Sequence, residues 1–363
     1  MDDDMLDGFL PYSEDGVWEG NGELNDWEVG IAEASWDEDR LNGLYDIYRD
    51  CTLCPRSCHA DRTNGQVGYC GASDEVKVAR AALHYWEEPP ISGDNGSGTV
   101  FFAHCQLQCV YCQNAKISRA KIDPIENPWI SKSVDAAQLA RMFLNLEAEG
   151  ANNINLVSAT QYLPTVINAI VLARKEGLRV PIVYNTGGYE KVETLRLLSG
   201  FVDVYLTDVK HWDPASGARY AKAANYPKVA LSALSEMVSQ TGAPKYISYS
   251  TGEEIMESGT IVRHLLLPGA LDEAERILDY LGTEYGDRIV VSLMSQYVPM
   301  VDAKKYPEIA MRIDPVDYDN LVDYSCNFDF DECFMQESDS AETEYIPDFG
   351  GEGLIGSESK TLW

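Results

Sequence analysis

Three cysteines on one short stretch, Cys105, Cys109 and Cys112, have the spacing C-x3-C-x2-C, with Tyr111 just before the third. Three thiolates on one loop can hold three irons of a [4Fe–4S] cube. No fourth cysteine completes this run, so one iron would keep an open position for a ligand with an amine and a carboxylate. Zinc is the alternative, but a structural zinc ion normally takes four protein ligands.

A second group of cysteines precedes this run. Cys51, Cys54, Cys58 and Cys70 are enough to hold a metal by themselves, and glycines flank the last of them. Zinc and an auxiliary iron–sulfur cluster both suit four thiolates, and the spacing does not separate them. The sequence therefore predicts a metal knuckle ahead of the main domain, with either metal clipping a short segment in place.

The net charge of −31 over 363 residues is concentrated at the two ends. Residues 1–40 and 314–363 each hold 14 acidic side chains and one basic one. Such flanks are typical of acidic tails that repel nucleic acid and anionic lipid. Because of this charge we do not expect nucleic acid as a partner. We do not expect a membrane either, because no apolar run approaches the ~20 residues of a bilayer span. With no basic region after Met1 to suggest a secretory signal, we expect a cytoplasmic protein.

The middle of the chain alternates between β-rich runs and helical patterns. The runs lie at 99–103, 153–158, 181–185, 202–209, 260–267 and 289–294. They are almost continuously apolar, as expected when helices cover both faces of a parallel sheet. Six such units predict an α/β fold with a partial (βα)6 TIM-like barrel, with an insertion in the long interval 202–260. The expected organisation is an acidic tail (1–40), the knuckle and lead-in segment (41–98), the core (99–300) and a second acidic tail (301–363).

The cysteine loop, placed directly after the first strand, resembles the signature of the radical S-adenosylmethionine (SAM) superfamily. Further stretches resemble one of its branches, the uncharacterised group related to pyruvate formate-lyase-activating enzymes. These stretches are 84–93, 96–99, 112–114, 184–190, 205–210, 263–269 and 292–299. The resemblance covers about 50 to 300 and neither acidic flank.

This resemblance implies a reaction. A reduced [4Fe–4S] cluster would pass one electron to SAM, whose carbon–sulfur bond breaks, and the 5′-deoxyadenosyl radical would take a hydrogen atom from the substrate. It also implies a one-electron donor such as a flavodoxin or ferredoxin, and a partner protein in which a glycyl radical is formed. The alternatives are radical modification of a small molecule or peptide, and an iron–sulfur electron carrier without SAM chemistry.

The resemblance also implies roles for particular residues. Cys105, Cys109 and Cys112 would be the cluster ligands, and Tyr111 would pack near the adenine. The segment from Ser158 to Gln161, which includes Thr160, follows the second strand, where the superfamily places groups that meet the SAM amine. This segment lacks the acidic residue of the common form.

The remaining SAM-binding candidates follow later strands. Asn185 and Thr186 follow the third strand, and Asp208 and Lys210 match an Asp-x-Lys after the fourth that approaches the methionyl end of SAM. Lys210 could pair with the SAM carboxylate. Arg263, in the fifth strand, is a second candidate clamp for a carboxylate. Asn185 and Thr186 could also be turn residues, and Asp208 and Lys210 a structural ion pair.

Several residues keep two interpretations. His84, Glu87 and Glu88 lie just ahead of the first strand, where they could face the substrate or brace the cysteine loop, and the bracing role is favoured. His264 alternates with Arg263, so a packed histidine is as reasonable as a functional one. Trp18, Trp27 and Trp36 in the N-terminal flank could pack on the body or dock a partner.

Overall fold

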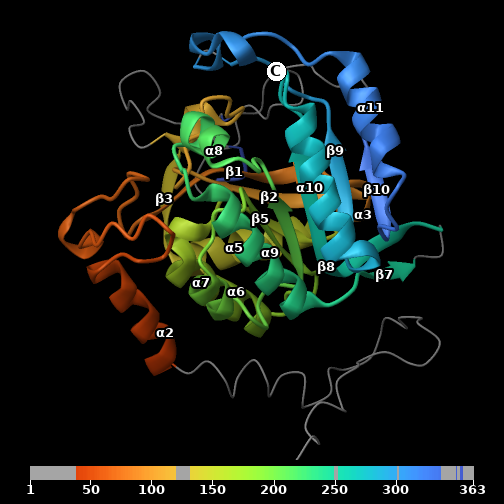
Figure 1. The fold of residues 1–363 in the computed structure, drawn as a ribbon. Helices are drawn as coiled ribbons and strands as arrows, with labels where there is room; N and C mark the ends of the chain where they lie inside the picture. Colours follow the sequence, from red (N-terminus) through yellow and green to blue (C-terminus); the bar gives the residue numbers. More distant parts are fainter. Residues whose placement is uncertain are drawn as a thin grey trace, which may run out of the picture.

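The structure is a computed structural model that describes residues 38–119, 131–248, 252–300, 302–336, 349 and 352–354 (Figure 1). Trp18, Trp27 and Trp36 lie outside these residues. The strands are β1 (Val76–His84), β2 (Ser97–Phe102), β3 (Lys132–Val134), β4 (Ile154–Val157), β5 (Ile182–Thr186), β6 (Val204–Asp208), β7 (Lys245–Ser248), β8 (Glu254–Leu265), β9 (Val290–Met294) and β10 (Glu332–Met335). The helices are α2 (Glu38–Tyr45), α3 (Pro89–Ser92), α4 (Ala115–Ser118), α5 (Ala136–Ala148), α6 (Leu163–Lys175), α7 (Val192–Leu197), α8 (Pro214–Ala221), α9 (Tyr226–Thr241), α10 (Leu271–Glu284) and α11 (Pro315–Ser325).

The six expected β-rich runs form the parallel centre of one sheet, in the order β2-β4-β5-β6-β8-β9. Each strand lies beside its sequence neighbour in this series, which is the strand order of a TIM-type barrel wall. β1 and β3 extend one edge antiparallel, β10 extends the other in parallel, and β7 pairs with β8. Over the described residues the sheet is open, with β3 and β10 at its two ends. The α/β class is confirmed, and the barrel is not closed.

The two faces of each central strand have different surroundings because successive side chains alternate. Tyr184 and Tyr205 lie in the apolar cluster that packs the sheet on its helices. Their neighbours Val183 and Val204 lie in a second cluster, together with Ile91 of α3. α3 therefore fills one end of the space that the curved sheet encloses. This end is apolar, so the polar inward residues are left for the other end.

Hydrogen bonds secure α3 in this position. The amide of Asn153 donates to the carbonyl of Ile91, and that of Asn152 to the carbonyl of Ser92, both at 2.7 Å. Gly93 ends the helix with φ at 47°, a left-handed conformation that favours glycine. Glu88 is the N-cap of α3, so the fixed position of this short helix also fixes Glu88.

The expected helices form where the pattern places them. In α5, Leu139, Met142, Phe143 and Leu146 are buried on one face. Asp135 and Gln138 make a reciprocal capping box that satisfies free backbone N–H groups at the start of this helix. The long interval 202–260 does contain additional elements, α8, α9 and β7. Within the described residues, no helix combines the length and the apolar character needed to cross a bilayer.

The segment expected to be a C-terminal acidic tail is partly folded. Residues 302–336 include α11, which packs beside α10, and β10, which pairs with β9 (Figure 1). Leu321 of α11 is fully buried, and the hydroxyl of Tyr318 donates to the carbonyl of Leu293 at 2.8 Å. The acidic side chains remain on the outside while a minority of apolar residues docks the segment. Charge counting alone missed this arrangement.

We predict that Leu321→Ala lowers the free energy of unfolding by about 2–5 kcal/mol, because it leaves a cavity beneath a docked helix. Val316→Ala on the same helix, where the side chain is 61% exposed, is the matched control and should change it by less than ~0.5 kcal/mol. Chemical denaturation of the full chain measures both. Equal, small effects would mean that α11 is not docked on the sheet.

Candidate active site

A cavity of about 980 Å³ opens inside the curved sheet, and Pro89, Pro90 and Ser92 of α3 line part of it beside the apolar cluster around Ile91. Cys105, Cys109 and Cys112 line it from the loop that follows β2. The carboxyl ends of the parallel strands line it as well, which is where barrel folds build their sites. The three cysteines and most of the predicted strand-end residues therefore face one space.

The cysteine loop is compact and its thiols are shielded from water. His104 and Gln108 have positive φ values of 71° and 57°, which turn the chain back on itself. Burial raises the pKa of the Cys109 thiol to about 12, although the ammonium of Lys210 acts in the opposite direction. The Cys109 thiol is therefore protonated until a metal displaces the proton.

The donor set on this loop suits a [4Fe–4S] cluster. In a [4Fe–4S] cube each thiolate binds a different iron, so the sulfurs stand further apart than ligands around one ion. Three cysteines at the mouth of one cavity, with no fourth on the loop, meet this requirement.

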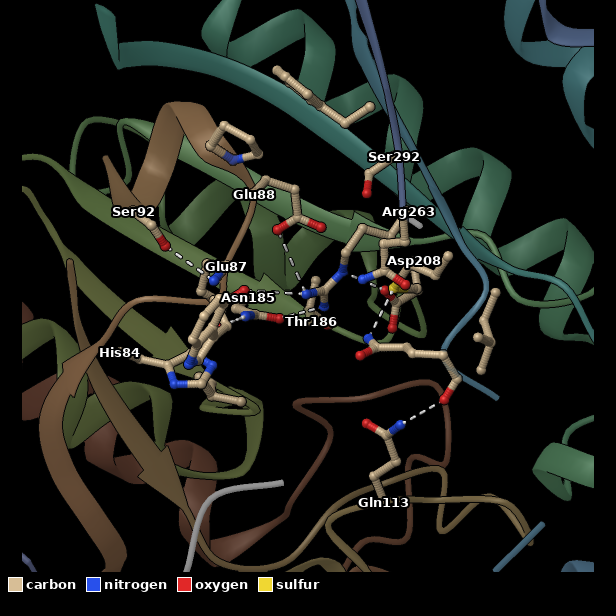
Figure 2. Close-up of a pocket in the computed structure, with 18 of the residues that line it drawn as sticks. His84, Glu87, Glu88, Ser92, Gln113, Asn185, Thr186, Asp208, Arg263 and Ser292 are labelled. Carbon is tan, nitrogen blue, oxygen red and sulfur yellow. Dashed lines mark hydrogen bonds and ion pairs between the residues drawn. The ribbon is translucent and has the colours of Figure 1, made fainter. Parts of the chain in front are cut away.

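A charged network crosses the cavity (Figure 2). The carboxylate of Asp208 accepts from Arg263 Nε at 2.8 Å and pairs with the ammonium of Lys210. Burial opposes the charge on Asp208, but the two cations lower its pKa nonetheless. Burial likewise opposes the charge on Lys210, and Asp208 outweighs it and raises the pKa of the ammonium. All three groups are thus charged near neutral pH.

Arg263 also binds side chains from other elements. Its Nη2 donates to Asn185 Oδ1 at 2.7 Å, and its Nη1 lies 3.4 Å from Glu87 Oε2 and 4.0 Å from Glu88 Oε2. The predicted residues Asn185 and Arg263 are therefore in contact. An incoming carboxylate would have to compete for a guanidinium that already has partners.

Glu87 and Glu88 line the cavity and contact Arg263, and over the described residues neither forms a hydrogen bond or ion pair with the cysteine loop. Of the two interpretations of these residues, the geometry favours the one in which they face a ligand. Burial raises the pKa of Glu88 to about 7, with Arg263 acting against it. His84 also lines the cavity, and burial lowers its pKa to about 4, so it is neutral at pH 7.

Tyr111 faces the cavity and is held by a buried contact. Its hydroxyl lies 3.0 Å from Nε2 of His211, whose pKa burial lowers to about 3. The neutral imidazole fixes the ring without adding charge. Thr186 also lines the cavity, as the sequence predicts.

The segment after β4 divides between two environments. Ser158, with a positive φ of 59°, lines the cavity. Thr160 instead bonds Glu190, and Gln161 donates to the carbonyls of Ala103, His104 and Ser158. Among the lining residues only Ser158 of this segment reaches the cavity, so Thr160 and Gln161 are placed away from it.

Glu190 is a buried carboxyl group that the sequence analysis missed. It is 1% exposed, and its Oε1 accepts from Thr186, from Thr160 at 2.7 Å and from Gln106 at 3.0 Å. Burial raises its pKa to about 7, although these hydrogen bonds act in the opposite direction. No local pattern marks this residue. It connects the cysteine loop to β5 through Gln106 and Thr186.

His264 forms a hydrogen bond with the carbonyl of Val209 at 2.7 Å and is a packed histidine.

The four N-terminal cysteines come together against the cysteine loop. Cys51, Cys54, Cys58 and Cys70 line one small hollow, which also includes Gln106. Two bonds join this segment to the loop directly: Arg56 Nε donates to the carbonyl of Gln106 at 3.1 Å, and Gln108 Nε2 to the carbonyl of Tyr69 at 2.8 Å. The two cysteine groups are therefore neighbours in space.

Comparison with known proteins agrees with this geometry. Residues 99–240 match the model of the radical SAM superfamily, a segment that includes the C-x3-C-x2-C loop and part of the cavity wall. This segment is therefore similar to the radical SAM superfamily, a family that implies a [4Fe–4S] cluster and SAM as cofactors. The chain is also similar to the uncharacterized protein MJ0674 of Methanocaldococcus jannaschii, with 28% identity over 289 residues, 78% of this chain and 77% of that protein.

Several solved structures are similar to this chain at low identity. SuiB of Streptococcus suis bound to its precursor peptide SuiA is 14% identical, with a TM-score of 0.44 over 66% of this chain and 49% of SuiB. This chain thus spans about half the length of SuiB. A radical SAM methyltransferase from Sphaerobacter thermophilus is 15% identical, with a TM-score of 0.45 over 68% of this chain and 69% of that one.

We predict that Glu190→Gln increases stability above pH 7 and has little effect near pH 4.5. The unfolded chain loses this proton near pH 4.5 and the folded chain near pH 7, so the wild type loses stability as the pH rises between the two values. The expected gain at pH 8 is about 2–3 kcal/mol. The control is the exposed Glu193, changed to Gln. Unfolding measured at pH 5 and pH 8 tests this, and a pH-independent effect would contradict it.

Proposed function

We propose that this protein is an enzyme that cleaves SAM reductively and abstracts a hydrogen atom from a substrate. The observation that carries the proposal is that Cys105, Cys109 and Cys112 open onto the same cavity as Asn185, Asp208 and Lys210. When bound there, a [4Fe–4S] cluster supplies the electron that breaks a carbon–sulfur bond of SAM. Cys105, Cys109 and Cys112 would hold it.

The protein's own residues bind and orient the ligand in this scheme. Lys210 is charged and lies next to the cysteine loop, so it suits the SAM carboxylate once Asp208 shares it. Asn185 and Thr186 present polar atoms, and Gly187 lets the backbone approach, since a Cβ there would lie 3.1 Å from Leu107 and 3.3 Å from Lys210. Tyr111 offers a ring for the adenine. The buried wall excludes water from these contacts.

The volume of the cavity favours an enzyme over an electron carrier. About 980 Å³ is at the upper end of the range for small-molecule sites, and it holds far more than a cluster needs. A carrier has no use for such a space or for a charged network within it. We propose a partner protein as the substrate, with a glycyl radical as the product, in line with the resemblance to pyruvate formate-lyase-activating enzymes. A flavodoxin or ferredoxin would supply the electron.

We also propose that the four-cysteine hollow holds a second metal, zinc or an auxiliary iron–sulfur cluster. Cys51, Cys54, Cys58 and Cys70 line it together, and Gly68 leaves room for Cys58, whose Sγ would clash with a Cβ at that position. Gln106 and Gln161 each leave an amide oxygen buried without a hydrogen-bond partner among the described residues. Both chemistries remain open for this donor set.

We predict that the anaerobically reconstituted protein releases 5′-deoxyadenosine from SAM in the presence of dithionite. Cys109→Ala should abolish the release, because the cluster loses a ligand, and Cys326→Ala is the control, since this exposed cysteine lies elsewhere. Chromatography of the products gives the measurement. No release from a fully loaded wild-type cluster would favour an iron–sulfur electron carrier.

With a candidate glycyl radical enzyme added, electron spin resonance should show a protein radical doublet, and its absence in active samples would favour another substrate.

We predict that the triple variant of Cys105, Cys109 and Cys112 to alanine still binds metal, because the second site has its own ligands. Elemental analysis of this variant should find zinc or iron, and the further change of Cys51 and Cys54 to alanine should remove it. A triple variant that contains neither element would refute the second site.

A further inference from the structure

The lining of the cavity carries an excess of negative charge. Among the described residues that line it, the acidic side chains are Glu87, Glu88, Asp94, Asp208, Glu253, Glu254 and Glu332, and the basic ones are Lys210 and Arg263. Such a lining attracts cations and repels anions. The excess of negative charge therefore favours a ligand that carries a positive charge.

The two basic residues are already engaged. Asp208 forms an ion pair with Lys210 and accepts a hydrogen bond from Arg263 Nε, and Asn185 Oδ1 accepts one from Arg263 Nη2. One nitrogen, Nη1, is left between two carboxylates, 3.4 Å from Glu87 and 4.0 Å from Glu88. A single donor at these distances satisfies neither carboxylate fully.

Glu88 is the group with the greater deficit. It is 8% exposed, and its Oε2 has no hydrogen-bond partner among the described residues. The carboxyl group accepts hydrogen bonds from Ser292 and from its own backbone N–H, so Oε2 is the part of it that lacks a donor. A buried carboxylate oxygen without a donor is costly, and this one therefore suits a partner from outside the chain. Figure 2 shows Glu88 beside the Arg263 network, with its carboxyl group in the cavity.

We propose that Glu88, assisted by Glu87, binds an organic cation, an ammonium or a guanidinium, on the ligand that fills this cavity. The inference rests on the proposed function, because it takes the cavity as the site of SAM and substrate. A cation at Glu88 Oε2 would supply the missing donor. It would also balance the charge of the second carboxylate, since Arg263 faces both Glu87 and Glu88 with a single positive charge. A neutral or anionic group would leave Oε2 without a donor, with the shared Nη1 of Arg263 still 4.0 Å away.

Two molecules could bring this cation. SAM carries an ammonium, and the segment after β4 offers no acidic group to it, since Thr160 and Gln161 bond elsewhere. A substrate with an amine or guanidine group would have the same chemistry. The two sources differ in whether the Glu88 carboxylate contributes to the affinity for SAM itself.

The binding should depend on pH. The groups that face Glu88 are Arg263 from β8, Glu87 from the preceding segment, Ser292 from β9 and His84 from β1. Arg263 stays charged and His84 stays neutral at pH 7. The protonation state that changes in this range is therefore that of Glu88, which has Glu87 beside it. The carboxylate binds a cation and the carboxylic acid does not, so affinity should rise from pH 6 to pH 8.

The test is equilibrium binding to the anaerobically reconstituted holoenzyme without reductant. The ligands are SAM, then putrescine and agmatine added to the SAM-loaded enzyme, with 1,4-butanediol as the neutral match of putrescine. The variants are Glu88→Gln and, as a control that removes the same charge from the lining, Glu332→Gln on β10. Glu88→Gln should weaken the binding of the relevant cation about tenfold or more. Glu332→Gln should change it by no more than about twofold.

The outcomes separate the sources. Weaker SAM binding in Glu88→Gln assigns the site to the SAM ammonium, and weaker putrescine or agmatine binding with SAM unaffected assigns it to a substrate cation. If Glu88→Gln equals wild type for SAM and for both amines, the proposal is overturned. Should Glu88→Gln not fold, Glu87→Gln and the pH profile of wild-type binding decide, and a flat profile overturns it. A wild type that binds SAM but releases no 5′-deoxyadenosine refutes the proposed function instead.

Discussion

The buried guanidinium of Arg263 is the interaction on which the arrangement of the cavity depends. It joins β8 to Asp208 on β6, to Asn185 on β5 and to Glu87 ahead of α3. Without it, these carboxylates would lie close together in a buried space with only Lys210 to balance them, at a cost of several kcal/mol. The Arg263 side chain thus fixes the position of the segment that leads into α3 relative to strands β5, β6 and β8.

The second constraint acts on the cysteine loop. A loop that must present three sulfurs in one geometry needs support from neighbouring segments, because β2 ends at Phe102, ahead of the first cysteine. The four-cysteine segment gives this support. Arg56 bonds the carbonyls of Gln106 and Lys222 and packs with its guanidinium 4.0 Å from the centre of the Tyr69 ring. A metal in the four-cysteine hollow would therefore stiffen the loop that holds the other one.

Much of the fold could be predicted from the sequence. The six central strands are continuous apolar runs, and such runs stay in a buried parallel sheet whatever surrounds them. β1, β3, β7 and β10 escaped prediction for a physical reason. Residues 332–335, Glu-Cys-Phe-Met, become a strand because β9 offers a free edge, and nothing in four residues among acidic neighbours signals that edge. The folding of α11 likewise depends on the groove beside α10.

The sequence by itself determined the cysteine spacings, the six strands and the polar residues at their ends, because each is a local pattern of residue type. Only the tertiary structure decided which of those side chains share a cavity. Ser158 faces it while Thr160, two residues on, faces Glu190, since the chain turns between them. The contact between Glu87 and Arg263 joins residues 176 positions apart. Such a contact is set by the closing of the sheet around α3, and no local pattern encodes it.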